Sequence, residues 1–301
     1  MGIGASDLRN LMHLRDIGAL PEHGSIIEIG AQQLADSFLA DAEDLEKIRT
    51  SFRLDRPFQI AATPASQMPS GRLVPLRADA PRAAEFWHWL GYRYASIDID
   101  SSPASIPLDL NYDRVPRRHV GKYSIVTNYG TTEHIANQLN AFRVIHDLTA
   151  PGGIMIHVVP AQGMFNHGLI NYNLKFFWML ARSNGYGWLD MDFRPDPIPS
   201  PVSPDLVNEI ARYHPDIIER SASYQAPDGA ILVAMRKDFN IPFVAPLDVP
   251  SDVRTDIRAL RKRYWTVFNP EAFAHAQIRD RTRKRIVGAV RRVIARRVRV
   301  L

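Results

Sequence analysis

The sequence predicts an α/β protein built on a parallel sheet, and three observations lead to this prediction. Short apolar runs alternate with amphipathic stretches of helical period between residues 25 and 160. Glycine, proline or polar turn residues separate these stretches, and strands that alternate with helices are typical of parallel sheets with crossover helices. With 301 residues, of which 46% are hydrophobic, the chain is also long enough to bury the core of one large domain.

The first half of the chain supplies most of the expected alternation. In order, we expect a helix at 6–20 with Ser6 as its N-cap, a buried strand at 25–29, a helix at 31–40, an irregular Arg- and Pro-rich stretch at 41–79, a helix opened by Pro81 and closed by Gly91, and strands at 94–100, 105–110 and 122–130. Residues 41–79 do not fit the alternation, and we interpret them as an insertion.

The second half continues the same pattern and then becomes helical and basic. In order, we expect a helix at 137–148 stopped by Pro151-Gly152-Gly153, a strand at 154–160, a helix at 173–184 capped by Gly185, a strand at 187–193, a Pro-rich loop followed by a helix at 205–213, a strand at 229–237, and helical sequence from about residue 251.

The composition narrows the class of protein. There is no cysteine, which excludes a disulfide framework, a thiolate metal site and a cysteine nucleophile. The sequence has neither a long apolar run nor a signal-peptide pattern, so we expect a cytoplasmic protein. Arginine outnumbers lysine 31 to 6, a composition typical of a GC-rich bacterium.

The basic charge is concentrated at one end of the chain. Residues 279–301 hold ten basic residues and one acidic residue, a charge of +9, so the remainder of a chain with net charge +5 carries −4. A mildly acidic body disfavours a nucleic-acid partner. The tail places Ile, Val and Leu on one helical stripe, which fits peripheral contact with an anionic membrane, binding of RNA, or packing on the protein itself.

The stretch "SIIEIGAQQL" at residues 25–34 has the outline of a nucleotide-binding turn. An apolar strand runs into Glu28 and then Gly30, and a helix is expected to begin at Ala31. Gly30 would let the backbone approach a ligand closely. The other glycines of such turns are missing, which argues against a pyrophosphate because that group needs a cradle of backbone N–H groups.

Six segments form an ordered series along the chain: "IIEIGAQ", "YASIDID", "IPLDL", "KYSIVTNYGTTEHI", "IHDLTAPGGIMIHVVP" and, more loosely, "GAILVAMRK". This series, over roughly residues 25–236, resembles class I S-adenosylmethionine (SAM)-dependent methyltransferases. The resemblance implies a Rossmann-like, doubly wound, mostly parallel seven-stranded sheet with helices on both faces, here with an insertion and a C-terminal basic helix. It also implies SAM as the cofactor.

The resemblance assigns the cofactor loop to the end of the first strand. Glu28, Gly30 and Ala31 would lie beside the cofactor, and Gln32 would hydrogen-bond its amino-acid end. Gln32 and Leu34 stand where the family usually has further glycines, which narrows the slot. An ordinary strand-to-helix turn with a salt-bridged Glu28 is the alternative.

Further cofactor contacts are implied at the ends of the next strands. Asp98, or else Asp100, would accept both ribose hydroxyls, with Ile99 beside it; a helix cap is the alternative role for Asp98. Asp109 would accept from the adenine amino group, although "DLNYD" also fits an Asx turn. Leu110 would pack on the ring. Asn128 would face the methionine part or the substrate.

Three histidines are candidates for a general base that deprotonates an acceptor hydroxyl, because the pKa of imidazole lies close to neutral pH. His134 follows the fourth strand and His167 lies in the loop after the fifth. His157 lies inside a strand, where a buried structural histidine is expected. Glu133 is a further candidate. Because these histidines are scattered along the sequence, we expect no metal site.

Residues near His167 are expected to line the acceptor pocket. Phe165, Asn166 and Tyr172 precede the aromatic helix "NLKFFWML", whose own aromatic residues fit a buried helix face. We therefore predict methyl transfer from SAM to a small-molecule acceptor, such as a sugar, glycan or secondary-metabolite hydroxyl, with His167 or His134 as base. The alternatives are an NAD-dependent oxidoreductase of Rossmann type and a non-catalytic membrane-associated scaffold.

The predicted organisation has three parts. Residues 1–24 form an N-terminal helical segment, residues 25–240 the methyltransferase domain with its insertion, and residues 241–301 a helical extension that ends in the basic tail at 279–301.

Overall fold

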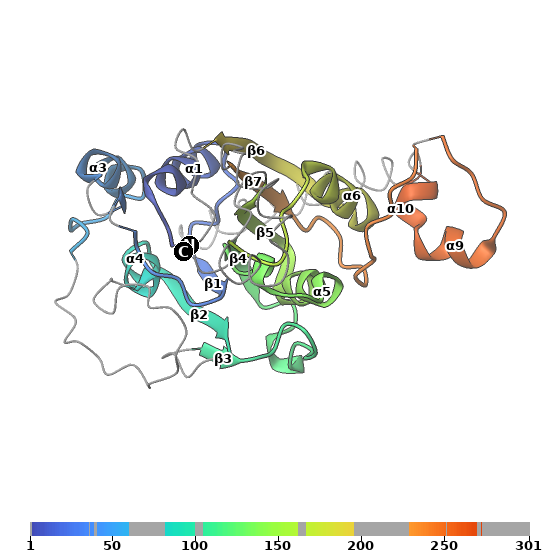
Figure 1. The fold of residues 1–301 in the computed structure, drawn as a ribbon. Coiled ribbons are helices and arrows are strands. Elements are labelled where there is room, and N and C mark those ends of the chain that lie inside the picture. Colours follow the sequence, from blue (N-terminus) through green and yellow to red (C-terminus); the bar gives the residue numbers. More distant parts are fainter. Residues whose placement is uncertain are drawn as a thin grey trace, which may run out of the picture.

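The protein, described here by a computed structural model, is organised around one mixed sheet. The model describes residues 2–35, 37–38, 41–59, 82–99, 105–161, 167–195, 229–250, 252–269 and 272. Within these residues a seven-stranded sheet has the order β3-β2-β1-β4-β5-β7-β6 (Figure 1). The strands are β1 (Gly24–Ile29), β2 (Tyr92–Asp98), β3 (Ser105–Pro107), β4 (Tyr123–Tyr129), β5 (Thr149–Pro160), β6 (Gly187–Pro195) and β7 (Gly229–Arg236).

Strand pairing is parallel except around β7. β1 pairs in parallel with both β2 and β4, β3 pairs in parallel with β2, and β4 pairs in parallel with β5. β7 runs antiparallel to its neighbours β5 and β6. The chain leaves β1 toward β2 on one side and returns as β4 on the other, so the topological switch point lies between β1 and β4. Ligands of such sheets bind at the carboxyl ends of the strands near this point.

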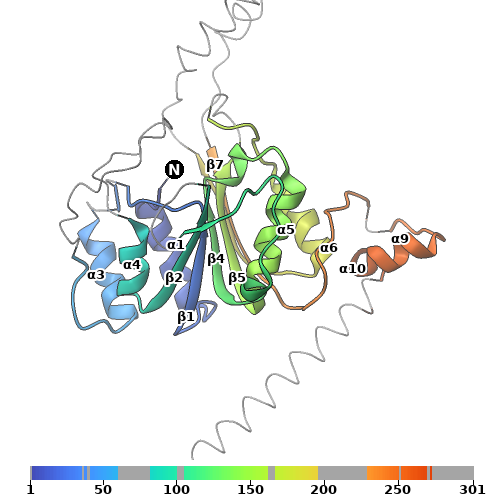
Figure 2. The same cartoon turned by 90° about the horizontal axis from the view of Figure 1, so that it is seen from below.

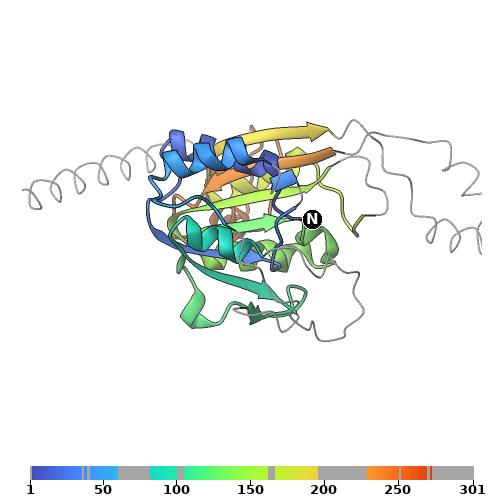
Figure 3. The same cartoon turned by 90° about the vertical axis from the view of Figure 1, so that its left-hand side faces the viewer.

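Helices cover both faces of the sheet (Figures 2 and 3). α1 (Ala5–Asp16), α3 (Ala42–Ser51) and α4 (Ala83–Trp89) lie on one face, and α5 (Gln138–Leu148) and α6 (Leu174–Asn184) lie on the other. Each face has its own cluster of buried apolar side chains. The predicted Rossmann-like, doubly wound, mostly parallel fold is therefore confirmed.

The N-terminal helix is part of the domain core. Leu8, Leu11 and Leu14 of α1 are fully buried in the same cluster as Ile26 of β1 and Ile125 of β4. Burial of each such side chain stabilises the fold by about 1.5–3 kcal/mol. The helix also reaches the far edge of the sheet, because Arg194 of β6 pairs with the buried Asp7 at 2.6 Å. The N-cap is Gly4 rather than the predicted Ser6.

The predicted helix at 31–40 is wrong in its first half. Residues 31–35 are not helical; Ile3 forms a parallel bridge with Leu34. The backbone N–H of Ile3 donates to the carbonyl of Gln33, and the N–H of Ala35 donates to the carbonyl of Ile3, both at 2.9 Å. This tertiary pairing occupies backbone groups that a helix would use for its own hydrogen bonds.

The stretch at 41–79 is partly regular. It contains α3, whose N-cap Asp41 accepts a hydrogen bond from the N–H of Asp44 at 3.1 Å. Residues 60–81, the predicted helix at 205–213 and the basic tail at 279–301 lie outside the described residues.

Residues after β7 pack along α6 before two short helices, α9 (Arg258–Arg263) and α10 (Trp265–Phe268). Thr266 donates to the carbonyl of Ser183 at 2.8 Å, and the N–H of Val244 donates to Asn184 at 2.8 Å. No helix in the part of the chain that the structure describes is long and apolar enough to cross a membrane.

Gly30, the residue after β1, has a conformation and surroundings that a larger residue would disturb. Its φ is +77°, and a Cβ at this position would lie 2.3 Å from the Oγ1 of Thr131. Thr131 follows β4, so the loops after the two central strands touch at this point. Glycine is therefore required by the close approach of the neighbouring loop as well as by its backbone angle.

We expect Gly30→Ala to lower the free energy of unfolding by about 2–4 kcal/mol, because it adds a steric clash to a left-handed backbone. Gly18→Ala is the matched control, since Gly18 has φ +68° and nothing within 4 Å of the added Cβ; it should cost only about 1–2 kcal/mol. Urea unfolding measures both. Equal costs would show that the contact with Thr131 is not a constraint.

Candidate functional site

The predicted cofactor residues gather at the carboxyl ends of β1, β2 and β4, and Glu28 is the most deeply buried acid among them. Its side chain is fully buried. Its carboxylate accepts hydrogen bonds from the N–H of Gln32 at 3.0 Å, the indole of Trp87 at 2.7 Å and the hydroxyl of Tyr94 at 2.8 Å. Glu28 thus holds the loop after β1 against α4 and β2, and the salt bridge considered from the sequence is replaced by three neutral donors.

Burial raises the pKa of Glu28 from 4.5 to about 7, while the bonds from Gln32, Trp87 and Tyr94 lower it. The folded protein therefore binds this proton more tightly than the unfolded chain does. The corresponding stability is fully present below pH 4.5 and is lost as the pH rises through about 7.

The Gln32 side chain bridges the loops after β1 and β4. It is 5% exposed, and its amide nitrogen lies 3.1 Å from the carbonyl of Gly30 and 3.2 Å from the Oγ1 of Thr131. Its Oε1 is buried and has no hydrogen-bond partner among the described residues. A buried carbonyl oxygen of this kind has the capacity to accept a hydrogen bond from a ligand donor.

Asp98 ends β2 and faces the same loop. One carboxylate oxygen accepts from the N–H of Ala31 at 3.0 Å, and the other accepts from the N–H of Ile99 at 2.8 Å. Each oxygen keeps a further lone pair for another donor. Ile99 is 69% exposed, which places an apolar side chain on the surface directly beside the acid. Asp98 caps no helix among the described residues; it fixes the two loops to each other.

Asp109 and Leu110 follow β3 beside Asp98. The Oδ1 of Asp109 accepts from the N–H of Asn111 at 2.8 Å, which is the Asx turn that the sequence left open. Leu110 is 4% exposed and packs in the core on the α5 face. Its carbonyl accepts from Asn140 of α5 at 3.0 Å. Contact of these two residues with an adenine ring stays a prediction.

Asn128 shapes the turn after β4 from a fully buried position. Its amide nitrogen donates to the Oγ1 of Thr132 at 2.8 Å, and its carbonyl oxygen accepts from the N–H of Thr132 at 3.2 Å. The hydroxyl of the buried Tyr172 lies 2.8 Å from the same Thr132 oxygen. Asn128 and Tyr172, predicted to contact cofactor and acceptor, therefore share one partner, Thr132, and no sequence pattern singles this residue out.

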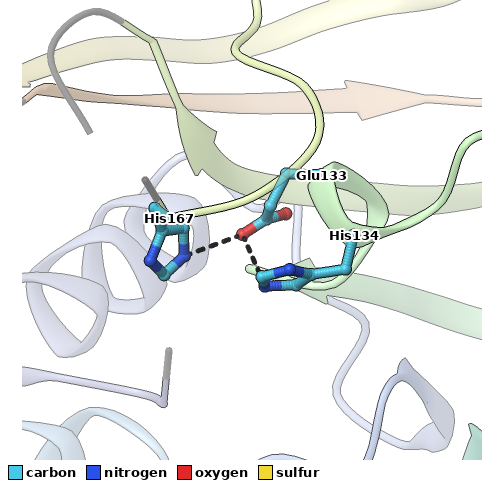
Figure 4. Close-up of side chains that lie close together, drawn as sticks. All are labelled: Glu133, His134 and His167. Carbon is cyan, nitrogen blue, oxygen red and sulfur yellow. Dashed lines mark ion pairs between the residues drawn. The ribbon is translucent and has the colours of Figure 1, made fainter. Parts of the chain in front are cut away.

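Glu133, His134 and His167 form a cluster at the ends of β4 and β5 (Figure 4). Nε2 of His167 lies 3.4 Å from Oε1 of Glu133, and Nε2 of His134 lies 3.9 Å from the same oxygen. The three side chains each offer one ligand atom, and these atoms all lie within 4.8 Å of one another. His167 is far from Glu133 and His134 in the sequence, so the sequence alone did not predict the cluster. The residues meet because β4 and β5 are adjacent parallel strands, and the loops that follow them lie side by side.

The loop after β5 is docked onto Glu133 by its backbone. The N–H groups of Leu169 and Ile170 donate to the carbonyl of Glu133 at 2.8 and 3.1 Å. A Cβ on Gly168 would lie 2.9 Å from the Cγ of Glu133, so only glycine fits between the two loops. This docking places His167 beside the carboxylate of Glu133, and no sequence motif predicts it.

The carboxylate of Glu133 is fully buried, and neither oxygen has a hydrogen-bond partner among the described residues. The His134 side chain is 47% exposed and that of His167 is 31% exposed, so solvent reaches the cluster at its two imidazoles. Burial lowers the pKa of His134, and the charge of Glu133 offsets part of that effect. A neutral imidazole can take a proton or bind a cation.

His157 is a core histidine, as predicted. It is 1% exposed, and its ring packs against Phe142 and Phe177 at 5.6 and 5.2 Å between centroids. Burial lowers the pKa of His157 to about 3. It is therefore neutral at physiological pH and too enclosed to serve as the base.

A cleft of about 450 Å³ lies at the end of β5, the middle of β6 and the start of β7. It is lined by Ala161, Asn171, Tyr172, Asn173, Leu174, Met191, Asp192, Phe193 and Ile231. Tyr172 joins this cleft to Thr132 of the turn that carries Glu133 and His134. Phe165 and Asn166 lie outside the described residues. A larger hollow of about 650 Å³ lies at the opposite end of the fold, between Asp16 and α3, away from the strand ends.

Comparisons with solved structures find several methyltransferases. The chain is similar to a candidate methyltransferase from Bacillus halodurans (11% identity, 78% of this chain and 100% of that chain, TM-score 0.43). It is also similar to the YcgJ protein from Bacillus subtilis (11%, 78% and 100%, 0.41). A third is 1,6-didemethyltoxoflavin-N1-methyltransferase from Burkholderia thailandensis, with bound 1,6-didemethyltoxoflavin and S-adenosylhomocysteine (10%, 76% and 77%, 0.38).

No protein-family model matches the sequence, and no curated protein does. The strand order and directions of the sheet itself confirm the fold that the resemblance implies. Identities this low say nothing about a shared substrate, so the chemistry depends on the residues at the strand ends.

We expect the difference in unfolding free energy between the wild type and Glu28→Gln to fall by about 3 kcal/mol as the pH rises from 4.5 to 8. The wild type loses the stabilisation that its buried, protonated carboxyl provides, and the glutamine variant has no such titration. Urea unfolding at several pH values measures this. A difference that stays constant over the range would contradict the raised pKa of Glu28.

We expect Glu133→Gln to raise the free energy of unfolding by about 1–3 kcal/mol in the presence of a chelator, because it replaces a buried carboxylate without partners by a neutral amide. Glu46→Gln is the control. Glu46 is 56% exposed and ion-paired with Arg49, so its change should leave the free energy of unfolding nearly unchanged. A destabilised Glu133→Gln protein would show that the carboxylate serves the fold.

Proposed function

We propose that the protein is a SAM-dependent methyltransferase that acts on a small-molecule acceptor. One observation carries the proposal. At the switch point of the sheet, the polar groups of Gln32 and Asp98 lie close to the Glu133–His134–His167 cluster. The products would be the methylated acceptor, S-adenosylhomocysteine and a proton. The acceptor oxygen or nitrogen forms a bond to the methyl carbon, and the electron pair of the broken carbon–sulfur bond stays on sulfur.

The residues at the ends of β1 and β2 fit SAM. The orphaned Oε1 of Gln32 and the nearby carbonyl of Gly30 are acceptors for an ammonium group. The carboxylate of Asp98 has lone pairs free for ribose hydroxyls, and the exposed Ile99 offers an apolar surface to a base. When bound, SAM supplies an activated methyl group; these side chains hold and orient it.

The same loop fits a dinucleotide poorly. A pyrophosphate binds at a helix N-terminus that directly follows the first strand. Residues 31–35 are not helical here, and the N–H groups of Ala31 and Gln32 already donate to Asp98 and Glu28. SAM carries no phosphate and needs no such N–H groups, so the loop favours SAM over NAD.

The acceptor side is assigned to the cleft beside Tyr172. Its volume of about 450 Å³ falls in the usual range of small-molecule sites. Its lining mixes apolar side chains, such as Leu174 and Phe193, with Asn173 and Asp192. In the metal-free protein His167 is the group best placed to take the acceptor's proton, because it is partly exposed and is positioned by Glu133 at 3.4 Å.

Isothermal titration with S-adenosylhomocysteine and with NAD tests the cofactor assignment. We expect binding of S-adenosylhomocysteine and none of NAD. Asp98→Asn and Gln32→Ala should each weaken binding about 10-fold or more, since each removes hydrogen bonds to the ligand and those of Asp98 are made by a charged group. Asp55→Asn is the control, because Asp55 is exposed and its neighbour Arg56 contacts Trp89 at the end of α4, at the amino end of β2.

Micromolar binding of NAD alone would overturn the proposal. Unchanged affinity in Gln32→Ala would remove Gln32 from the site but leave Asp98. If S-adenosylhomocysteine does not bind and no acceptor is methylated, the non-catalytic scaffold becomes the better description of the chain.

A further inference from the structure

We infer that Glu133, His134 and His167 form a binding site for a divalent transition-metal ion of the zinc type. The inference rests on the positions of three side chains and on the burial of one of them. The site belongs to the protein whether or not methyl transfer is its reaction. The use of the ion in catalysis, by contrast, rests on the proposed function.

The spacing of the three side chains is close to that of a metal site. Bonds of about 2.0–2.1 Å at tetrahedral angles place ligand atoms about 3.3 Å apart. The separation between His167 and Glu133 is 3.4 Å and that between His134 and Glu133 is 3.9 Å. All three ligand atoms lie within 4.8 Å, so closure around an ion requires only small side-chain rotations. Figure 4 shows both imidazoles directed at the same carboxylate oxygen.

The buried carboxylate is the independent observation that points to a ligand. Glu133 is fully buried, and both its oxygens lack hydrogen-bond partners among the described residues. Nε2 of His167, which faces it, is buried without a hydrogen-bond partner in the same sense. Charged groups deprived of water are normally paired or bound to a metal. A divalent cation would bind Oε1 of Glu133 and Nε2 of His167 at once.

The donor set selects the class of ion. Two imidazoles and one carboxylate form one of the ligand sets found in catalytic zinc sites, which keep a position open for water or substrate. Imidazole suits Zn²⁺, Cu²⁺, Ni²⁺ and Fe²⁺ better than it suits Mg²⁺ or Ca²⁺, which favour oxygen ligands. The partial exposure of His134 and His167 leaves the cluster accessible to a water molecule or a substrate at the open position.

The backbone holds the ligands in place without help from the ion. Glu133 and His134 lie in the one-turn helix η2 (Thr132–His134), whose Thr132 is fixed by Asn128 and Tyr172. His167 belongs to the loop that donates two backbone hydrogen bonds to the carbonyl of Glu133. Such preorganisation is what a metal site needs in order to bind tightly.

Within the proposed methyltransferase the ion would replace the free imidazole base. An acceptor hydroxyl bound at the open position would have its pKa lowered by the cation, and its proton would pass to solvent before or during transfer of the methyl group. An imidazole nitrogen that binds the ion cannot also take a proton. His134 and His167 would then act as ligands in the loaded enzyme and as a base only in its absence.

The test measures binding of Zn²⁺ by calorimetry and of Co²⁺ by visible absorption, on the full chain stripped with a chelator. The chain has no cysteine, so any tight site must use imidazole and carboxylate ligands. We expect one ion per chain. Glu133→Gln, His134→Gln and His167→Gln should each weaken Zn²⁺ binding at least about 100-fold, more than the loss of an outer-shell partner does.

His23→Gln is the matched control, because His23 is exposed and lies just before β1, at the amino end of this strand and away from the carboxyl ends that carry the cluster. It should leave Zn²⁺ affinity unchanged. S-adenosylhomocysteine affinity, measured on the same variants, should also remain unchanged, which shows that each variant is folded and separates the two proposals.

Absence of a tight Zn²⁺ site in the wild type, or a site whose affinity does not change in the three variants, would overturn the inference. Zn²⁺ binding that depends on Glu133 without any binding of S-adenosylhomocysteine would support the metal site and reject the methyltransferase. Binding of both ligands supports both proposals.

Discussion

One buried carboxylate ties together the elements around the predicted cofactor loop. Glu28 accepts three hydrogen bonds, from the loop after β1, from Trp87 of α4 and from Tyr94 of β2. The covalent path between these partners is long, because residues 30–91 lie between β1 and β2. Backbone hydrogen bonds with Ile3, Ile97 and Ala83, and the contacts with Asp98 and Thr131, hold the same loop in addition. Glu28 is therefore the side chain through which the loop after β1 is joined to both α4 and β2.

Glu28 and Glu133 are equally buried, but their surroundings differ in kind. The first has three donors, and the second has none among the described residues. A carboxylate removed from water without partners is costly, and folding alone gives no reason to keep it. A buried polar group without hydrogen-bond partners is expected at a functional site rather than in the supporting core. We therefore assign Glu28 to the structural support of the site and Glu133 to its chemistry.

The sequence was sufficient for the sheet but not for the site. Apolar runs and turn residues predict most of the strands, because their period and punctuation are local properties of the chain. The helix expected from Ala31 is wrong because Ile3, far away in sequence, pairs with Leu34 and overrides local propensity. The cluster around Glu133 depends on β4 lying next to β5 and on the docking of Gly168, which no local pattern records. Asp98 was predictable because it ends a strand; Thr131 and Thr132 were not.

The docking of the loop after β5 has a consequence for ligand binding. Glu133 and His134 are carried by one loop and His167 by another, and two backbone hydrogen bonds from Leu169 and Ile170 join them. Local opening at these two bonds separates the side chains while the sheet stays intact. An ion would fasten the loops to each other, and Tyr172, a few residues along, would be held with them. Binding of the ion and the shape of the acceptor cleft would then be coupled, so each ligand would raise the affinity for the other.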